Sequence, residues 1–490
     1  MDMPPEDLRT ALAPALALLQ SPLVQTLLAT HPNDLGSWTA AESDQKDVFG
    51  EEWWCEWVSG QDNEDNGGRG EDLWEGVLEY YMSQYRRRSA DDYEEEVGSN
   101  SKNLKLPEQI RSLIDDLVQL ALPRACTVDG SGVEVESTGL SPKKLHEVRQ
   151  CIAYMSTLLP KLFTANETRR LRVVDVGSGQ GYLTRALQTY LQSANVDVQL
   201  LALDFNEVQT AGAAKMMARD KRDGQIAQRT IYIKPDTLLA AVDDWIGEDE
   251  EQPVLFVALH ACGSLTPDIF RAVFEQRRRQ SSRWRPVGVL AVGCCYNLLA
   301  PGDFPLSTHL RSLAPTTLPG SAYHLAAQIP AEWARSPAAW ADSKLALRKV
   351  VWRAILGGRL AHRENLQQDT PGAPSGTGDK PVMRRLGRLN NAVYDTWETF
   401  TAAASAKLGV PLESELAPGE KRRMAGLGAL HVLRCLVGPL VESVIVADRV
   451  VWVAEQLEGE MEVGAVNLFN QATGSGRNVA IAVWPRQGDR

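Results

Sequence analysis

The sequence has few cysteines and no cysteine pattern that would organise a fold. Its 490 residues include seven, at positions 55, 126, 151, 262, 294, 295 and 435, without a repeated Cys-x-x-Cys spacing. An odd number of scattered cysteines in a long chain argues against a disulfide framework and against zinc held by two ligand pairs. We therefore expect reduced thiols, a protein of the cytosol or nucleus, and no structural zinc.

The sequence also lacks an uninterrupted apolar run, and we expect no secretory leader. No basic region precedes the first apolar stretch, which argues against a signal peptide. The most apolar run, 436–453, contains Glu442, Asp448 and Arg449. Each such charge costs roughly 2.5 to 3.5 kcal/mol at a bilayer centre, so we expect a buried helix and no membrane contact.

An excess of positive charge is missing too. The chain has 51 Lys and Arg against 63 Asp and Glu, a formal net charge of -12. Indiscriminate coating of nucleic acid is excluded, because such binding comes mainly from cations that neutralise phosphates. Basic residues cluster only locally, in the runs 86–88, 277–285, 384–388 and 421–423, which could follow an RNA backbone or be solvated helix faces.

What the chain does have is the composition of a globular protein, with 44% apolar and 23% charged residues. Its length exceeds what one core usually organises. We expect a helical amino-terminal region with acidic stretches (1–138), in which tryptophans 53, 54, 57 and 74 anchor short helices. A core (139–300), a helical insertion with a linker near 367–380 (301–460) and a terminal hairpin (461–490) follow. We find no internal repeat.

Five short apolar runs alternate with helical patterns in the core. They are 171–176, 198–204, 230–234, 254–260 and 288–294. Near-continuous apolar strands are typical of a parallel sheet covered by helices on both faces. The runs 464–469 and 478–484 flank Thr473–Gly476 and predict an antiparallel hairpin. The sequence therefore predicts an α/β fold whose mostly parallel sheet ends in a hairpin.

The strongest local motif is Asp175–Gly181, DVGSGQG, between the first strand and a helix. Glycines allow the unusual backbone angles of such a turn and a close approach to a ligand. A dinucleotide fingerprint would need glycine at position 182, where this chain has Tyr182. The observed Gly-x-Gly-x-Gly is the form of S-adenosylmethionine (AdoMet) binders, with Asp175 placed to meet the cofactor's ammonium group directly or through water.

Acidic residues follow the next two strands. Asp204 ends the second strand, where one carboxylate can accept both hydroxyls of a ribose, or can act as a helix N-cap. Asp236 could meet the adenine amino group or could cap a solvent-facing helix.

The fourth and fifth strands end in LHACG (259–263) and GCCYN (293–297). Ligands in open α/β sheets bind beyond the carboxyl ends of the strands, so these side chains should share one crevice. Three interpretations of these side chains stay open. The side chains form a substrate pocket with His260 as base or donor and Tyr296 holding the acceptor, they bind zinc, or they only fill space in the core.

A third motif, SPKKLHEV at 141–148, begins a helix with Ser as N-cap and Pro at the first position. Lys143 and Glu147 could support the acceptor site or could simply be an i, i+4 surface pair.

These stretches resemble the methyltransferase-like protein 25 family over about residues 139 to 485. FPLS (304–307) and PLVES (439–443) with Asp448 and Arg449 also match, in the family's order. The histidine-cysteine and double-cysteine motifs resemble, more distantly, those of the tRNA acceptor-stem 2'-O-methyltransferases. This chain departs from the patterns at Tyr296, where the tRNA enzymes have histidine, and at Gly476, which replaces a family proline.

The resemblance implies a Rossmann-like class I methyltransferase that uses AdoMet. The acceptor lone pair would displace the sulfonium methyl directly, with rate gained from positioning. We expect a macromolecular acceptor, RNA slightly ahead of protein, and a monomeric enzyme; a catalytically silent binding module is the third possibility. The expected acceptor-side residues are His260, Tyr296, Lys143, Lys144 and Glu147. The expected cofactor residues are Asp175, Gly177, Gly179, Gly181, Tyr182, Asp204, Asp236 and Leu259.

Overall fold

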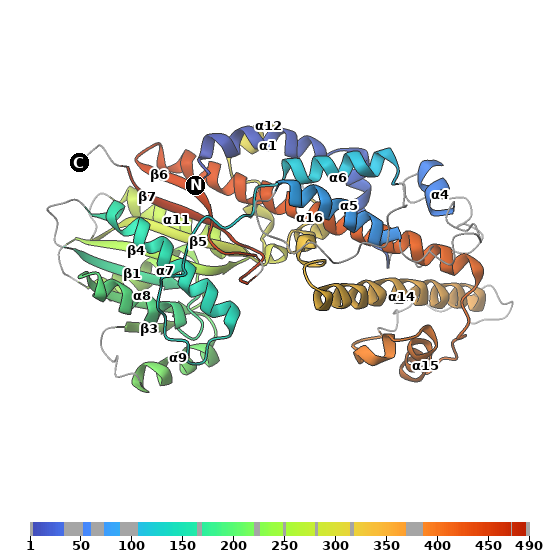
Figure 1. Cartoon of the computed structure of the whole chain (residues 1–490). Helices are drawn as coiled ribbons and strands as arrows, with labels where there is room; N and C mark the ends of the chain where they lie inside the picture. The colour runs from blue at the N-terminus through green and yellow to red at the C-terminus, as the bar shows by residue number, and fades with distance from the viewer. Residues whose placement is uncertain are drawn as a thin grey trace. The chain divides into compact units, whose positions relative to one another are not determined.

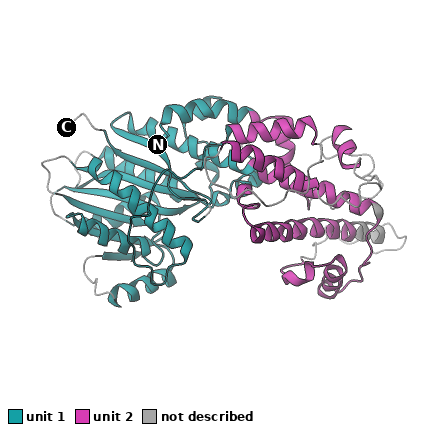
Figure 2. Ribbon diagram, in the orientation of Figure 1, with its two compact units in different colours: residues 1–17, 120–327, 438–490 teal, residues 18–119, 328–437 magenta. Residues whose placement is uncertain are grey.

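The computed structural model describes residues 3–33, 52–59, 73–88, 106–163, 169–219, 226–247, 251–279, 283–313, 318–368, 386–471 and 473–486. These residues fall into two compact units (Figure 2). Unit 1 contains 1–17, 120–327 and 438–490, and unit 2 contains 18–119 and 328–437. The units cut across the four expected segments, since 120–138, 301–327 and 438–460 all belong with the core.

Unit 1 is built on one sheet of seven strands in the order β3-β2-β1-β4-β5-β7-β6. β1 to β5 are parallel, and β7 is antiparallel to both β5 and β6. This confirms the mostly parallel sheet that ends in a hairpin, and it is the strand order of a class I methyltransferase. The strands are β1 (Arg170–Val176), β2 (Asp197–Asp204), β3 (Ile226–Thr230), β4 (Gln252–Cys262), β5 (Trp284–Cys294), β6 (Met461–Asn467) and β7 (Val479–Pro485).

Helices cover both faces of this sheet (Figure 1). One face packs against α7, α8 and α9, with Val173, Leu200, Leu255 and Leu290 in its buried cluster. Alternate strand residues point to the other face, where α11 packs on β4 and β5. The helices of unit 1 are α7 (Pro142–Leu162), α8 (Tyr182–Ser193), α9 (Glu207–Arg219), α10 (Pro235–Ile246), α11 (Leu265–Arg278), α12 (Thr308–Leu313), α13 (Gly320–Leu325) and most of α1 (Pro5–Leu19).

The third strand lies four residues earlier than expected. The prediction chose 230–234, but β3 is Ile226–Thr230, and the chain enters α10 at Pro235. β3 is an edge strand and only partly buried, so it carries Gln228 and Arg229 instead of an apolar run. The more apolar IYI at 231–233 is the loop that follows it.

Unit 2 is helical in its described residues. Its helices are α2 (Pro22–Ala29), α4 (Glu52–Ser59), α5 (Leu73–Arg88), α6 (Glu108–Leu120), α14 (Pro337–Gln368), α15 (Trp397–Leu408) and the first part of α16 (Pro418–Leu457). Trp54, Trp57 and Trp74 are buried on α4 and α5, as expected of anchoring tryptophans, whereas Trp53 is only half-buried. The acidic stretches between these helices and the linker residues 369–385 lie outside the described residues.

The apolar run 436–453 is a buried part of α16, as predicted. By length and composition α16 could cross a membrane, and so could α1 and α2 if they formed one bent span. The most apolar window of α16 is 89% buried within the protein, which is also what the core helix of a globular protein shows. Its charged residues Glu442, Asp448 and Arg449 have polar partners in unit 1.

Candidate active site

The glycine turn after β1 depends on three backbone conformations that side chains disfavour. Gly177, Gly179 and Gly181 have φ values of 78°, 54° and 70°, all in the left-handed region. The Gly177 N–H donates to the carbonyl oxygen of Leu203 over 2.8 Å, and Gly181 is the N-cap of α8. The turn is thus hydrogen-bonded to the end of β2 and leads directly into α8. This confirms the predicted order of strand, glycine turn and helix.

Asp204 lies directly beside this turn. Its carboxylate accepts hydrogen bonds from the backbone N–H of Gly179 and of Asn206, both over 2.8 Å and on different oxygens. Each carboxylate oxygen has a second lone pair, so the hydroxyls of a ribose can still be accepted. Asp204 therefore orients the turn and stays suited to its expected role.

The space above the turn fits a ligand. A methyl group added at Gly179 would meet no atom within 4 Å. The hydroxyl of Ser178 is buried and has no hydrogen-bond partner among the described residues. A buried hydroxyl without a partner in such a turn is a group that a polar ligand such as AdoMet could satisfy.

Asp175 supports the turn from inside the protein. It is 1% exposed, and its carboxylate accepts a hydrogen bond of 2.6 Å from the Thr184 hydroxyl on α8. Burial, reinforced by the nearby charge of Asp204, raises the pKa of Asp175 to about 6. Of the two expected contacts with the cofactor ammonium, direct or through water, such burial favours the indirect one.

Exposed apolar side chains mark a corner that sequence reasoning missed. Phe205, Val208 and Tyr232 are 70%, 80% and 72% exposed. Phe205 follows Asp204, and the Ile231 N–H donates to the Asp204 carbonyl, so these residues surround the end of β2. Exposed apolar side chains beside the carboxylate that is expected to bind a ribose suit an adenine ring. The available signal was an aromatic residue directly after the acidic end of a strand.

Asp236 does not join this corner. Because β3 ends early, Asp236 lies exposed in the first turn of α10, and the cap of that helix comes from Thr237, whose hydroxyl accepts from the Lys234 N–H. Asp236 lines a separate cavity of about 610 Å³ with Leu239 and Trp452, and no glycine-turn residue borders it. The adenine role predicted for Asp236 is therefore corrected to a favourable charge at a helix start.

His260, Glu147 and Lys143 do converge, as expected. The Nε2 atom of His260 lies 3.2 Å from one Glu147 oxygen, and Lys143 Nζ lies 3.9 Å from the other. The Glu147 side chain is only 2% exposed, whereas those of His260 and Lys143 are 40% and 57% exposed. A buried carboxylate thus orients an imidazole that solvent and substrate can reach.

A bulge in β4 produces this arrangement. Ala258 pairs with Ala291, but Ala261 pairs with Gly293, so β4 holds one extra residue at Leu259 and His260. Bulges re-aim side chains and are frequent beside active sites. Leu259 remains half-buried against the core cluster.

The same register shift places Cys262 opposite Cys294. Their sulfurs are 3.1 Å apart, and the Cys295 sulfur lies 3.5 Å from that of Cys262. Hydrogen bonding from Cys294 lowers the pKa of Cys262 to about 6, while the same interaction raises the pKa of Cys294. The hydrogen bonds within the group therefore favour ionisation of Cys262 over that of Cys294.

Tyr296 is not on the acceptor side. It is 1% exposed, and its hydroxyl donates to a Glu442 oxygen at 3.2 Å, while the Arg449 guanidinium lies 5.4 Å from its ring centre. Burial raises the pKa of Tyr296 far above its usual range. The acceptor-holding role predicted for Tyr296 is corrected to a structural one.

Lys144 and Tyr182 meet each other instead of His260. Lys144 Nζ lies 5.5 Å from the centre of the Tyr182 ring, and the Tyr182 hydroxyl donates to the Gly139 carbonyl over 2.8 Å. Tyr182 thereby ties the segment before α7 to the start of α8, next to the glycine turn. Its contact with the cofactor and the supporting role of Lys144 stay predictions.

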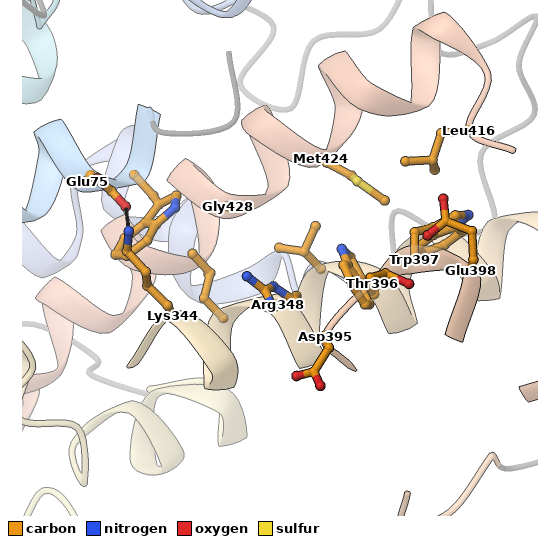
Figure 3. Close-up of a pocket in the computed structure, with 14 residues that line it drawn as sticks. Glu75, Lys344, Arg348, Asp395, Thr396, Trp397, Glu398, Leu416, Met424 and Gly428 are labelled. Atoms are coloured by element: carbon orange, nitrogen blue, oxygen red, sulfur yellow. Dashed lines mark ion pairs between the residues drawn. The ribbon is translucent and has the colours of Figure 1, made fainter. Parts of the chain in front are cut away.

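Unit 2 has a cavity of its own, of about 360 Å³. Figure 3 shows the Glu75–Lys344 ion pair at one end and Trp397 with Leu416 at the other, with Arg348 between them. None of the predicted site residues lines it, so the candidate active site is confined to unit 1.

Comparison with known proteins identifies the domain that contains these residues. Residues 143–302 match the family described as methyltransferase domain. Among solved structures, one similar protein is a geranyl diphosphate methyltransferase in complex with SAM, with 14% identity, a TM-score of 0.19, and coverage of 34% of this chain and 60% of that one. Another is the geranyl diphosphate C-methyltransferase of Streptomyces coelicolor A3(2), with 10% identity, a TM-score of 0.20, and coverage of 44% and 64%.

A third similar structure is the CMeT domain of the citrinin polyketide synthase, with 13% identity, a TM-score of 0.22, and coverage of 49% and 76%. The chain spans 60 to 65% of the length of the first three structures that it matches. At these TM-scores the similarities carry no weight of their own. The family match, the strand order and the glycine turn together identify unit 1 as carrying a class I methyltransferase domain, the domain class whose cofactor is S-adenosylmethionine.

Proposed function

We propose that this chain transfers a methyl group from AdoMet to a macromolecular acceptor, with RNA favoured. The observation that carries the proposal is that the glycine turn, Asp204 and the Glu147–His260 pair all lie at the carboxyl ends of the parallel strands. Ligands of open α/β sheets bind at this edge. Cofactor groups and an acid-base pair are therefore available at one edge of one sheet.

His260 is the proposed base. With its Nε2 proton donated to Glu147, the Nδ1 lone pair can take the acceptor's proton as the acceptor attacks the methyl carbon. The Glu147 carboxylate then stabilises the imidazolium, and Lys143 balances the charge of Glu147. AdoMet supplies the methyl group, and the bond from its sulfur breaks as the new bond forms.

The charge pattern supports one basic segment over another as the proposed RNA contact. In the run 277–285, Arg277, Arg279 and Arg285 pair with Glu460, Asp243 and Glu251. Paired arginines contribute little to phosphate binding, so this run is a poor RNA track. Lys144 is exposed at the start of α7, next to the Lys143–Glu147 pair, and is the better candidate.

We also propose membership of the methyltransferase-like protein 25 family, because the motifs of the resemblance converge in unit 1. Cys262, Cys294 and His260 gather at the ends of β4 and β5, and Asp448 binds the FPLS segment. A reduced, monomeric protein of the cytosol or nucleus completes the proposal. A protein acceptor is the alternative that the net charge of -12 leaves open.

The proposal is tested by incubating the full chain with radiolabelled AdoMet and separated RNA, protein and small-molecule fractions. Label should enter RNA, and His260→Ala and Glu147→Gln should each slow the single-turnover rate by roughly a hundredfold, the scale of a lost acid-base group. Their AdoMet affinity should stay within a few fold.

His324→Ala is the matched control, since His324 is exposed on α13 and belongs to none of these contacts. It should retain the full rate. Label in protein instead of RNA would show that the acceptor is a protein and would leave the proposed methyltransferase activity intact. No AdoMet binding by calorimetry would refute the proposal itself.

A further inference from the structure

We propose that Cys262, Cys294 and Cys295 form a binding site for one thiophilic metal ion, Zn²⁺, with a fourth coordination position open. The three sulfurs lie within 4.8 Å of one another. Sulfurs on a tetrahedral zinc are about 3.8 Å apart, given Zn–S bonds of about 2.3 Å. The Cys262 sulfur lies 3.1 Å from that of Cys294 and 3.5 Å from that of Cys295, somewhat below this spacing.

Neighbouring cysteines normally make poor co-ligands, because successive side chains of a strand point to opposite faces. Here β5 ends at Cys294, and Cys295 adopts a left-handed conformation with φ 48° and ψ 51°. This reversal allows both side chains to face Cys262. A non-glycine residue in this conformation is unfavourable and occurs often at functional sites.

The loop after β4 is also fixed in place. Gly263 has φ 55°, and a methyl group there would lie 2.6 Å from the Leu298 carbonyl oxygen. The Gly263 N–H donates to the Cys294 carbonyl over 2.9 Å. Only glycine allows the two strand ends to approach this closely, so the bulge and the glycine together hold Cys262 against its partners.

The cluster combines a buried sulfur with an exposed one. Three thiolates and Zn²⁺ carry a net charge of -1. Cys294 is buried but Cys262 is exposed, which leaves an entry path and room for water or another ligand in the fourth position.

Zinc binding exchanges S–H bonds for Zn–S bonds. Each thiol that binds releases one proton, so binding releases up to three protons and forms three Zn–S bonds without any change of oxidation state. A structural zinc with four protein ligands is still not expected, because the described residues supply only these three clustered ligands.

The test is elemental analysis of the full chain, purified under reducing conditions and then incubated with zinc and desalted. We expect about one zinc per chain, and occupancy reduced at least tenfold in Cys262→Ser, Cys294→Ser and Cys295→Ser. Cobalt substitution should give thiolate-to-cobalt absorption that each variant weakens. Cys126→Ser, at a half-buried cysteine outside the cluster, is the control and should keep full occupancy.

Zinc well below one per chain in the folded wild type would overturn the site, as would full occupancy in all three variants. A Cys262–Cys294 disulfide found by mass spectrometry in protein that takes up no zinc after reduction would overturn it too. Far-ultraviolet circular dichroism of each variant shows whether lost zinc reflects lost fold. None of these readouts depends on the proposed methyl transfer.

Discussion

At the scale of single residues, buried polar groups divide between chemistry and support. Tyr296 and Glu147 are both almost fully buried, yet Glu147 orients the exposed His260, while Tyr296 donates to Glu442 away from the substrate side. Position at a strand end predicts which edge a residue occupies, but not which way its side chain turns. That direction was decided by the left-handed Cys295, which the sequence does not reveal.

Tyr296→Phe should therefore affect stability and not turnover. Removing the hydroxyl leaves a buried Glu442 oxygen without that donor, and we expect a loss of about 1 to 3 kcal/mol in the free energy of unfolding. The rate per folded molecule should stay within about twofold. Urea denaturation and single-turnover kinetics on the same preparation check this, and a rate lowered a hundredfold in stable protein would return Tyr296 to the acceptor site.

Asp175 should give a measurable pH dependence. Its folded pKa of about 6 is raised above the usual value of 3.8, so its stabilising contribution is complete below the unfolded pKa and is lost as pH rises through 6. Asp175→Asn has no such titration. Between about pH 5 and 7.5 the wild type should lose about 1 to 2 kcal/mol relative to this variant in cofactor-free protein.

Urea denaturation at a series of pH values measures that difference. Thr189→Val, on the same helix as Thr184 but away from Asp175, should run parallel to the wild type. A constant difference between wild type and Asp175→Asn across this range would show that Asp175 is ionised throughout.

At the scale of elements, α16 contributes polar residues that hold the loops after β5. Asp448 accepts hydrogen bonds from the Leu306 and Ser307 N–H groups and the Ser307 hydroxyl, at 2.6 to 2.9 Å, and is 0% exposed. Two turns later the half-buried Glu455 accepts from the backbone N–H groups of Thr308 and His309. The helix thus binds the same loop twice, once inside the protein and once at its surface.

Asp448→Ala should cost about 3 to 5 kcal/mol of unfolding free energy, because three buried donors lose their acceptor. Glu455→Ala, the matched change on the same helix, should cost about 1 kcal/mol or less, since water can replace the carboxylate. Chemical denaturation compares the two. Equal losses would mean that burial does not set the strength of these contacts.

The sequence predicted the elements that carry a strong apolar pattern. β1, β2, β4 and β5 are buried on both faces, so their residues form continuous apolar runs near the predicted positions. β3 was misplaced because an edge strand needs no such run. The bulge at Leu259 and His260 leaves no trace in composition, and yet it determines which cysteine faces Cys294. The glycine turn was predictable because its backbone angles require glycine.

At the scale of the whole molecule, the matched family range is smaller than the structure that supports it. Residues 143–302 contain β1 to β5 but neither β6 nor β7, and they lack Glu442 and Asp448. Without β7, β5 would become an exposed edge with unpaired backbone groups. We therefore expect that residues 143–302, which the family description covers, do not fold on their own.

A protein truncated to residues 143–302 should be aggregated or unfolded and should not bind AdoMet. The full chain, expressed in parallel, should elute as a monomer with a cooperative melt. Size-exclusion chromatography and circular dichroism report the difference. A monomeric truncated protein with a sharp melting transition would show that the hairpin and α16 are dispensable.

The outer edge of the sheet, at β6, is covered by the start of the chain. Met3 exchanges both backbone hydrogen bonds with Ala465 of β6, at 2.8 and 2.9 Å, the one isolated bridge in the described part of the chain. β6 is otherwise the outermost strand beside β7, and its open side would offer a template for strands of other molecules. A tag fused close to Met3 should disturb this pairing and expose β6 to other molecules. We therefore expect less aggregation when the tag is placed after β7.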